Sequence, residues 1–300
     1  MLNSEASTHR APGRANQDFT WCIFRKNGVS SVNRSSQPPI PKIHDAPSVF
    51  QPEALLREAR RQRNLPTIDT PSICVLDPDG DVVRALKQSG TSRRHQGWAC
   101  YHTELEIFDL PGIGEVGIIG CAVGAPFAVL VAEQLFVSGC RLLVSVTSAG
   151  RIADLGPTPY FVLIDRALRD EGTSYHYQPP SSFADAPDPA LIARVESELK
   201  RLDRVVVHKG ATWTTDAPYR ETEEAIAAAR ADDVLAVEME AAALYAFAAA
   251  KKRTVVALAH VTNTMAVAEG DFEKGEADGT TVTLAVVAAV ARAWAEPGIG

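Results

Sequence analysis

The sequence predicts an α/β fold in which helices cover the faces of a buried sheet. Short apolar runs rich in β-branched residues alternate along the chain with longer segments of helix-forming residues. Hydrophobic residues make up 46% of the 300 residues and charged residues 22%, so a full core can form without disulfides or metals. Beyond residue 70 the sequence contains no linker-like stretch and no repeat of fixed period. We therefore predict one domain over residues 47–300.

The first 46 residues differ in composition from the rest of the chain. They are rich in Ser, Asn, Arg and Pro, and a Gln-Pro-Pro-Ile-Pro run occupies residues 37–41. Residues 1–20 lack the apolar centre of a secretory signal. A segment of this kind buries too little apolar surface to offset the entropy that it loses on ordering. We expect residues 1–46 to form a polar extension that is partly disordered.

Five elements are predicted between residues 52 and 119. Residues 52–64 open with proline and continue with helix formers, which is typical of an amphipathic helix. Residues 72–76 form a β-branched run before an Asp-Pro-Asp-Gly-Asp turn, so we predict a strand there and a helix at 82–88. Residues 98–110 and 115–119 flank a Pro-Gly turn and are predicted as strands.

Five further elements are predicted between residues 125 and 207. A helix over 125–138 ends at a glycine, and the apolar run 142–146 follows it as a buried strand. Residues 160–164 form a second apolar run and are also predicted as a strand. Residues 188–202 carry Leu and Val at helical spacing and predict a helix, with a short strand at 205–207.

The last third of the chain is rich in alanine. Residues 221–231 and 240–252 are predicted as helices because good helix formers dominate them. The apolar run 254–261 is predicted as a strand, and residues 280–295 as a closing helix. Strands that alternate with helices in this way favour a sheet covered by helices.

Charge and cysteine content exclude several classes of function. The net charge is −7 and the pI about 5.6, whereas a general nucleic-acid binder needs a basic face. The longest apolar stretches, 116–132 and 284–295, contain small residues and fit buried elements better than membrane spans. The five cysteines are odd in number and form no CxxC motif, which is typical of reduced thiols in a cytoplasmic protein. We therefore predict a cytoplasmic protein that binds neither nucleic acid nor membrane.

The sequence predicts no metal site. The Asp-Pro-Asp-Gly-Asp turn at residues 77–81 begins like a calcium loop, but the turn glycine and the final bidentate Glu of such a loop are missing. His95, Cys100 and His102 lack a fourth ligand at a recognised spacing.

Two segments place small or hydroxyl residues directly after a predicted strand. Residues 120–126 run Gly-Cys-Ala-Val-Gly-Ala-Pro before a helix, where Gly124 lets a ligand approach free N–H groups. Tight packing of strand on helix is the favoured explanation of this segment on its own. Thr147 and Ser148 follow the strand 142–146, at the edge where open α/β sheets bind ligands. A polar turn is the alternative there.

The run Val-Glu-Met-Glu-Ala-Ala at residues 237–242 is the most informative segment of the chain. Carboxylates at a helix start are favoured by the helix dipole, so capping by Glu238 and Glu240 is one explanation. Their apolar neighbours, Met239 among them, predict burial, and a buried carboxylate needs partners. Two neighbouring hydroxyls, as a ribose presents them, would supply such partners.

A further group combines aromatic, amide and charged side chains. Asp216, Tyr219 and Arg220 lie in the run 212–221, where an arginine beside aromatic residues can bind a flat heterocycle through its planar fork and by stacking. An ion pair between Asp216 and Arg220 is the alternative. Asn263 follows the last predicted strand and is either a turn residue or a hydrogen-bonding group for a leaving heterocycle.

Taken together and in this order, these segments resemble the nucleoside phosphorylase superfamily, in the branch of uridine phosphorylase, hexameric purine nucleoside phosphorylase and the methylthioadenosine/S-adenosylhomocysteine nucleosidases. Residues 120–150 fit the family's glycine-rich segment, helix and following strand. Residues 237–242 match its ribose-binding segment closely, and residues 215–219 resemble its base-site loop. The resemblance covers about residues 47–295 and implies a three-layer αβα sandwich around a mixed, partly barrel-like sheet.

The resemblance also implies an activity, which is cleavage of the N-glycosidic bond of a nucleoside with inorganic phosphate as acceptor. It implies no cofactor or metal, and a homo-oligomer that is a dimer or a hexamer. The site residues that it implies are Glu238, Met239 and Glu240 for ribose; Asp216, Tyr219 and Arg220 for the base; Thr147, Ser148 and Gly124 for phosphate or another nucleophile; and Glu240, Asn263 and Arg220 for catalysis.

Several positions depart from the family's pattern. Leu-Asp-Pro at residues 76–78 stands where the family has Gly-Asp-Pro, and Ser145 and Gln96 stand where it has phosphate-binding arginines. Phosphate needs charge-assisted donors, and an acidic turn repels it. Asn263 stands where the purine enzymes of the family carry an Asp. An Asn at this position is more similar to the pyrimidine enzymes. Two alternatives therefore stay open, a nucleosidase that uses water and a nucleoside-binding protein without activity.

Overall fold

The computed structural model describes residues 40, 42–203, 205–265, 271–272, 274–275 and 279–295. The chain divides into two units, Met1–Lys42 and Ile43–Gly300, and the second carries all of the helices and strands described below. The predicted extension over residues 1–46 lies almost entirely outside the described residues.

The described residues of the second unit form a ten-stranded mixed sheet. Its strand order is β10-β6-β8-β9-β5-β1-β4-β3-β2, with β7 paired to β6 and a further pairing of β10 with β5. That last pairing closes β5, β10, β6, β8 and β9 into a ring, and β1, β4, β3 and β2 extend from β5 as an open wing. The strands are β1 Ile73–Asp77, β2 Ser92–Arg94, β3 Glu106–Leu110, β4 Gly114–Gly120, β5 Leu142–Arg151, β6 Tyr160–Asp170, β7 Phe183–Asp185, β8 Val207–Thr215, β9 Val234–Glu238 and β10 Thr254–Asn263.

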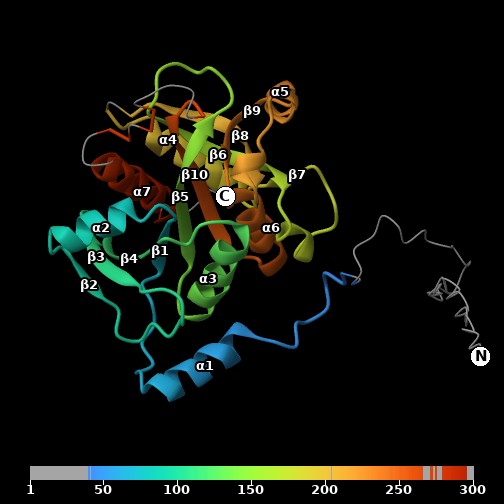
Figure 1. Cartoon of the computed structure of the whole chain (residues 1–300). Helices are drawn as coiled ribbons and strands as arrows, with labels where there is room; N and C mark the ends of the chain where they lie inside the picture. The colour runs from blue at the N-terminus through green and yellow to red at the C-terminus, as the bar shows by residue number, and fades with distance from the viewer. Residues whose placement is uncertain are drawn as a thin grey trace, which may run out of the picture. The chain divides into compact units, whose positions relative to one another are not determined.

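Helices cover two faces of this sheet (Figure 1). On one face α3 packs against both α1 and α6, and on the other α7 packs against α2 and α4, while α5 packs against β9. The helices are α1 Pro52–Arg63, α2 Asp81–Gln88, α3 Ala125–Val137, α4 Pro189–Leu199, α5 Glu223–Ala231, α6 Ala241–Lys251 and α7 Thr280–Ala295. The mixed α/β fold with a partly barrel-like sheet is therefore confirmed.

The ring strands are longer than the sequence predicts. β5 continues to Arg151 because β10 pairs with it as far as Asn263 opposite Gly150, and β9 pairs with it opposite the same glycine. The predicted end of this strand at residue 146 is therefore wrong, and the alternative of a polar turn at Thr147 and Ser148 is excluded because both residues lie inside β5. β6 and β8 also continue well beyond the predicted 160–164 and 205–207, since their pairing extends through polar residues.

The predicted strand over residues 98–110 is correct only from Glu106 onwards. Side-chain bonds hold the preceding residues in a loop. The indole N–H of Trp98 donates to the hydroxyl of Thr103 at 3.0 Å, and the His95 ring accepts from the backbone N–H of Gly97 at 3.1 Å. Strands β2, β7 and β9 are short and were not predicted.

The described residues give no sign of a membrane span, a disulfide or a metal site. None of their helices is long and apolar enough to cross a bilayer. None of their His, Cys, Asp and Glu side chains form a group of three able to hold a metal ion. The four cysteines among them are free, namely Cys74, Cys100, Cys121 and Cys140.

Candidate functional site

The loop between β4 and α3 brings a backbone donor to the start of α6. Gly124 is the residue before α3 and has φ +87° and ψ 149°, a conformation that only glycine adopts without strain. Its N–H donates to Oε1 of Glu240 at 2.7 Å. The glycine-rich segment thus joins two parts of the chain that are 116 residues apart.

Glu238 caps the helix that follows it. One of its carboxylate oxygens accepts from the backbone N–H groups of Glu240 and Ala241, at 2.7 and 2.8 Å. The other accepts from the hydroxyls of Thr212 and Thr214 on the neighbouring strand β8. Each oxygen therefore has two donors from within the protein, so the expected contact of Glu238 with ribose finds no free position.

Glu240 has the opposite character. Its side chain is only 1% exposed, and its second oxygen, Oε2, is buried without a hydrogen-bond partner. Burial raises the pKa of Glu240 to about 8, and the charge of Glu238 raises it further, against the lowering effects of the Gly124 N–H and the Thr147 hydroxyl. A ligand hydroxyl that bonds to this buried oxygen would relieve the cost of burying a polar atom without a partner.

The ends of β5 and β10 border the same region. Thr147 is buried near Glu240, and Ser148 beside it is half-buried. The amide of Asn263 donates to the carbonyl of Ala149 at 3.3 Å, while its oxygen accepts from the N–H of Met265 at 3.0 Å. Asn263 therefore holds the end of β5 against the segment that leaves β10.

The residues expected at the base lie on an exposed turn after β8. Tyr219 is 99% exposed, and Asp216 and Arg220 are exposed as well. Asp216 accepts from the N–H of Gly172 at 2.9 Å, and no ion pair joins it to Arg220 among the described residues. None of the bonds described here connects these three residues to Glu240. Met239, the neighbour of Glu240 in the chain, is half-buried.

The turn from β1 to α2 is acidic, as its sequence indicates. Asp77 is buried and accepts from the N–H groups of Gly80 and Val83, at 3.2 and 3.0 Å. Burial raises its pKa to about 6, with the charges of Asp79 and Asp81 acting in the same direction.

A lysine that the sequence analysis did not single out reaches this turn. The ammonium of Lys274 lies 2.9 Å from Oδ2 of Asp79 and also pairs with Asp81. The contact joins residues 195 positions apart, so no local pattern indicates it. His260, whose pKa is lowered by its burial and by the charge of Lys274, stacks on Phe161 at 4.3 Å between ring centroids.

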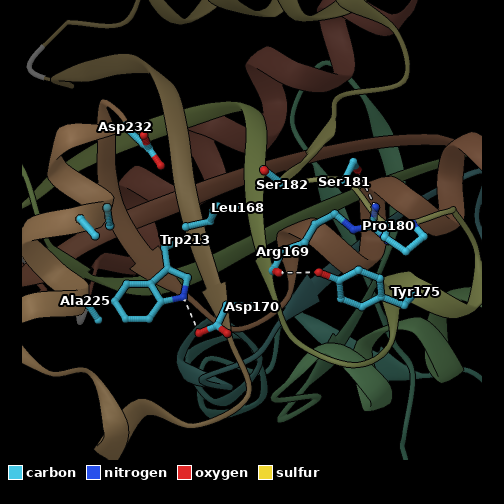
Figure 2. Close-up of a pocket in the computed structure, with 12 residues that line it drawn as sticks. Leu168, Arg169, Asp170, Tyr175, Pro180, Ser181, Ser182, Trp213, Ala225 and Asp232 are labelled. Carbon is cyan, nitrogen blue, oxygen red and sulfur yellow. Dashed lines mark hydrogen bonds between the residues drawn. The ribbon is translucent and has the colours of Figure 1, made fainter. Parts of the chain in front are cut away.

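A cavity of about 620 Å³ lies between α5 and residues 168–182 (Figure 2). Trp213 and Asp170 line it, joined by a 3.0 Å bond from the indole N–H to the carboxylate. A neighbouring cavity of about 290 Å³ includes Asp216. Glu240 lines neither cavity. Trp213 alternates along β8 with Thr212 and Thr214, which contact Glu238 on the other side of the strand.

Residues 72–293 match the family model described as the phosphorylase superfamily. The chain belongs to the phosphorylase superfamily. This confirms the resemblance noted in the sequence, since the match includes both the glycine-rich segment and the run at residues 237–242. No curated protein sequence matches the chain.

Solved structures support the superfamily fold. The chain is similar to the crystal structure of uridine phosphorylase from Vibrio fischeri ES114, with 19% sequence identity and a TM-score of 0.64. The alignment covers 76% of this chain and 95% of that one. A structure of the same enzyme complexed with 6-hydroxy-1-naphthoic acid matches with 18% identity, the same TM-score and the same coverage. At this identity the likeness extends to the fold and no further.

Proposed function

We propose that the protein cleaves the N-glycosidic bond of a nucleoside and that Glu240 holds the sugar. The observation that carries this proposal is the second oxygen of Glu240, which is buried at the end of the ring strands and has no donor among the residues that the structure describes. Paired hydroxyls on a ribose are suitable donors for such an oxygen. Membership of the phosphorylase superfamily supports the reaction class.

The arrangement suits the charge changes of glycosidic cleavage. As the bond breaks, positive charge develops on the sugar and negative charge on the departing base, and an enzyme must stabilise both in the transition state. In this proposal Glu240 faces the sugar with Met239 beside it, and Glu238 acts as a positioning residue that fixes the start of α6. Thr147 and Ser148, with the N–H of Gly124, border the position of the nucleophile.

The base would be bound from the other side of the sugar. We assign this role to Asn263 and to the exposed turn that carries Asp216, Tyr219 and Arg220. Because that turn is exposed, it must fold inward on binding or meet a second subunit there. Assembly as a dimer or hexamer is part of the proposal, and light scattering in solution tests it.

Two acceptors are compatible with this site. Phosphate, as expected from the resemblance, would make the protein a nucleoside phosphorylase. Water would make it a nucleosidase, and the acidic turn at Asp77, Asp79 and Asp81 favours water because carboxylates repel a phosphate dianion. We therefore favour hydrolysis, with phosphorolysis as the second candidate.

One experiment tests the reaction and the acceptor together. Purine and pyrimidine nucleosides are incubated with the protein in the presence and absence of phosphate, and free base, ribose and ribose 1-phosphate are measured. Replacement of the carboxylate in Glu240→Gln should lower kcat/KM about 10²- to 10³-fold, the usual effect of removing one preorganised group that stabilises the transition state.

The matched control is Glu133→Gln, which removes a carboxylate from α3 that accepts from the Tyr177 hydroxyl at 3.0 Å. It should retain wild-type turnover. Nucleoside binding without release of base, across the whole panel and with either acceptor, would instead identify a binding protein without activity. Equal turnover in wild type and Glu240→Gln would remove Glu240 from the mechanism.

A further inference from the structure

Lys274, which follows β10 in the chain, contacts the acidic turn that follows β1. Lys274 is 20% exposed in its side chain, and it lies between Asp79 and Asp81, which are 32% and 17% exposed. Burial acts to lower the pKa of Lys274, but the two aspartates together outweigh it and the pKa is raised. The lysine is therefore charged and is held by two carboxylates at once.

A second cation meets the same turn from α2. Arg84 pairs with Asp81 and donates to the carbonyl of Asp79 at 3.1 Å. Gly80, between the two aspartates, is in the left-handed region with φ +76°. Two cationic side chains therefore reach this turn, and its own aspartates pair with both of them.

This turn adjoins the loop that leads to the candidate sugar site. The N–H of Cys121 donates to the carbonyl of Asp77 at 3.0 Å, and the same loop ends at Gly124, which binds Glu240. A Cβ added at Gly80 would lie 2.7 Å from the sulfur of Cys121, so the turn and the loop are in close contact. An anion bound at the turn would therefore contact the same loop that binds Glu240.

We propose that Asp79 and Asp81 act as built-in anions that occupy Lys274 and Arg84, and that these three ion pairs determine the acceptor. The proposal rests on the proposed function, since it says why that site uses water. The turn holds a latent site for an inorganic oxyanion, and its own carboxylates fill that site. Lys274 is the specificity-determining cation, because it comes from outside the turn and pairs with both aspartates.

Phosphate binding tests this directly and requires no turnover. Isothermal titration calorimetry with inorganic phosphate is carried out on wild type, on the double variant Asp79→Asn/Asp81→Asn, and on the triple variant that adds Lys274→Met. The double variant keeps both cations and removes the two competing carboxylates. It should bind phosphate at least about tenfold more tightly than wild type, since a charge-assisted hydrogen bond contributes a factor of this order or more.

The triple variant separates the role of Lys274 from a general change of charge. It should lose the affinity that the double variant gains. A matched control, Glu58→Gln/Glu196→Gln, removes two carboxylates that are also paired with cations but lie on α1 and α4. It should bind phosphate as weakly as wild type.

Three results would overturn the proposal. These are tight phosphate binding by wild type, unchanged affinity in the double variant, or full retention of the gain in the triple variant. If the double variant does not fold, the wild-type titration and the single variant Asp79→Asn still test the proposal. The single variant should show a smaller gain in phosphate affinity. Ribose 1-phosphate as the wild-type product would also refute it while leaving glycosidic cleavage intact, whereas a protein that cleaves no nucleoside refutes only the proposed function.

Discussion

Two glutamates separated by one residue have opposite roles because their surroundings differ. Glu238 accepts four hydrogen bonds from within the protein, whereas Oε1 of Glu240 accepts from the Gly124 N–H and Oε2 has no partner among the described residues. The donors at the start of α6 are used by Glu238, so the Glu240 side chain is not needed as a cap. This division leaves Glu240 able to bind a ligand.

The raised pKa of Glu240 makes ligand binding depend on pH. In the free protein its pKa is about 8, with Glu238 and Thr147 facing it, so the carboxyl is largely protonated at pH 6. Sugar hydroxyls that donate to the carboxylate favour its charged form and lower that pKa. Nucleoside affinity should therefore increase with pH from 6 to 8, by up to about tenfold per pH unit.

Calorimetric titration of a nucleoside at several pH values measures this dependence. The Glu240→Gln variant serves as the control because it keeps the shape and removes the titration. Asp77 and Glu221 have pKa values near 6 and 7 and remain in that variant, so any slope they cause persists there. An affinity of wild type that stays flat from pH 6 to 8 would contradict the role given to Glu240.

For single residues, the sequence predicts the members of the candidate site better than it predicts the role of each. The run at residues 237–242 indicates both capping and ligand binding, and both occur, but only the hydrogen bonds show which glutamate does which. Lys274 and His260 were not predicted, because their contacts with Asp79 and Phe161 join distant parts of the chain. The spacing of residues within one segment does not indicate contacts between distant segments.

Among the elements, α6 links the site to the closed ring of strands. The hydroxyl of Tyr245 donates to the carbonyl of Ile164 in β6 at 2.6 Å and accepts from the N–H of Ala257 in β10 at 3.1 Å. The side chain is completely buried, so no water can replace it. Tyr245 thus satisfies backbone groups of two ring strands from one point on the helix.

The variant Tyr245→Phe should destabilise the protein by about 1–3 kcal/mol, since it leaves a buried donor and a buried acceptor without a partner. Chemical denaturation measures the change. Tyr101→Phe is the control, because that hydroxyl is bonded to Gln62 at an exposed position and its loss should cost little. A Tyr245→Phe protein as stable as wild type would show that β6 and β10 do not depend on this contact.

The sequence predicts the helices better than the strands. The closing helix over residues 280–295 and the helix that begins at Pro52 have the predicted bounds to within a residue. β5 and β8 were predicted too short because they continue through Thr, Ser and Trp residues, where the apolar run ends but the pairing does not. Strand length in a closed ring depends on partners that local sequence does not encode.

At the scale of the whole molecule, closure of the ring brings the candidate site together. Pairing of β10 with β5 sets Asn263 opposite Gly150, and pairing of β9 with β5 sets Val237 opposite the same glycine. Residues from three distant segments therefore meet at one edge. The resemblance implied this arrangement, whereas the alternation of strands and helices alone predicts only an α/β sheet.

Burial of Glu240 also affects stability as pH changes. Its pKa is about 8 in the folded protein and near 4.5 when exposed, so its contribution to stability is complete below 4.5 and is lost as pH rises through 8. His260 acts in the opposite sense, since its pKa is lowered to about 4 and its contribution is lost as pH falls from 6.5.

The melting temperature of wild type should therefore decrease between pH 6 and pH 8.5. Glu240→Gln should show a smaller decrease, because the amide does not titrate. Differential scanning calorimetry of both proteins at matched ionic strength measures the difference. Parallel curves over this range would indicate that Glu240 ionises freely in the folded protein.

A crystal structure with a bound, non-cleavable nucleoside analogue tests the central claim most directly. We expect a sugar hydroxyl within hydrogen-bonding distance of Oε2 of Glu240, with the bond from the Gly124 N–H to Oε1 retained. An analogue seated instead in the cavity beside Trp213, with Oε2 still lacking a donor, would contradict the account.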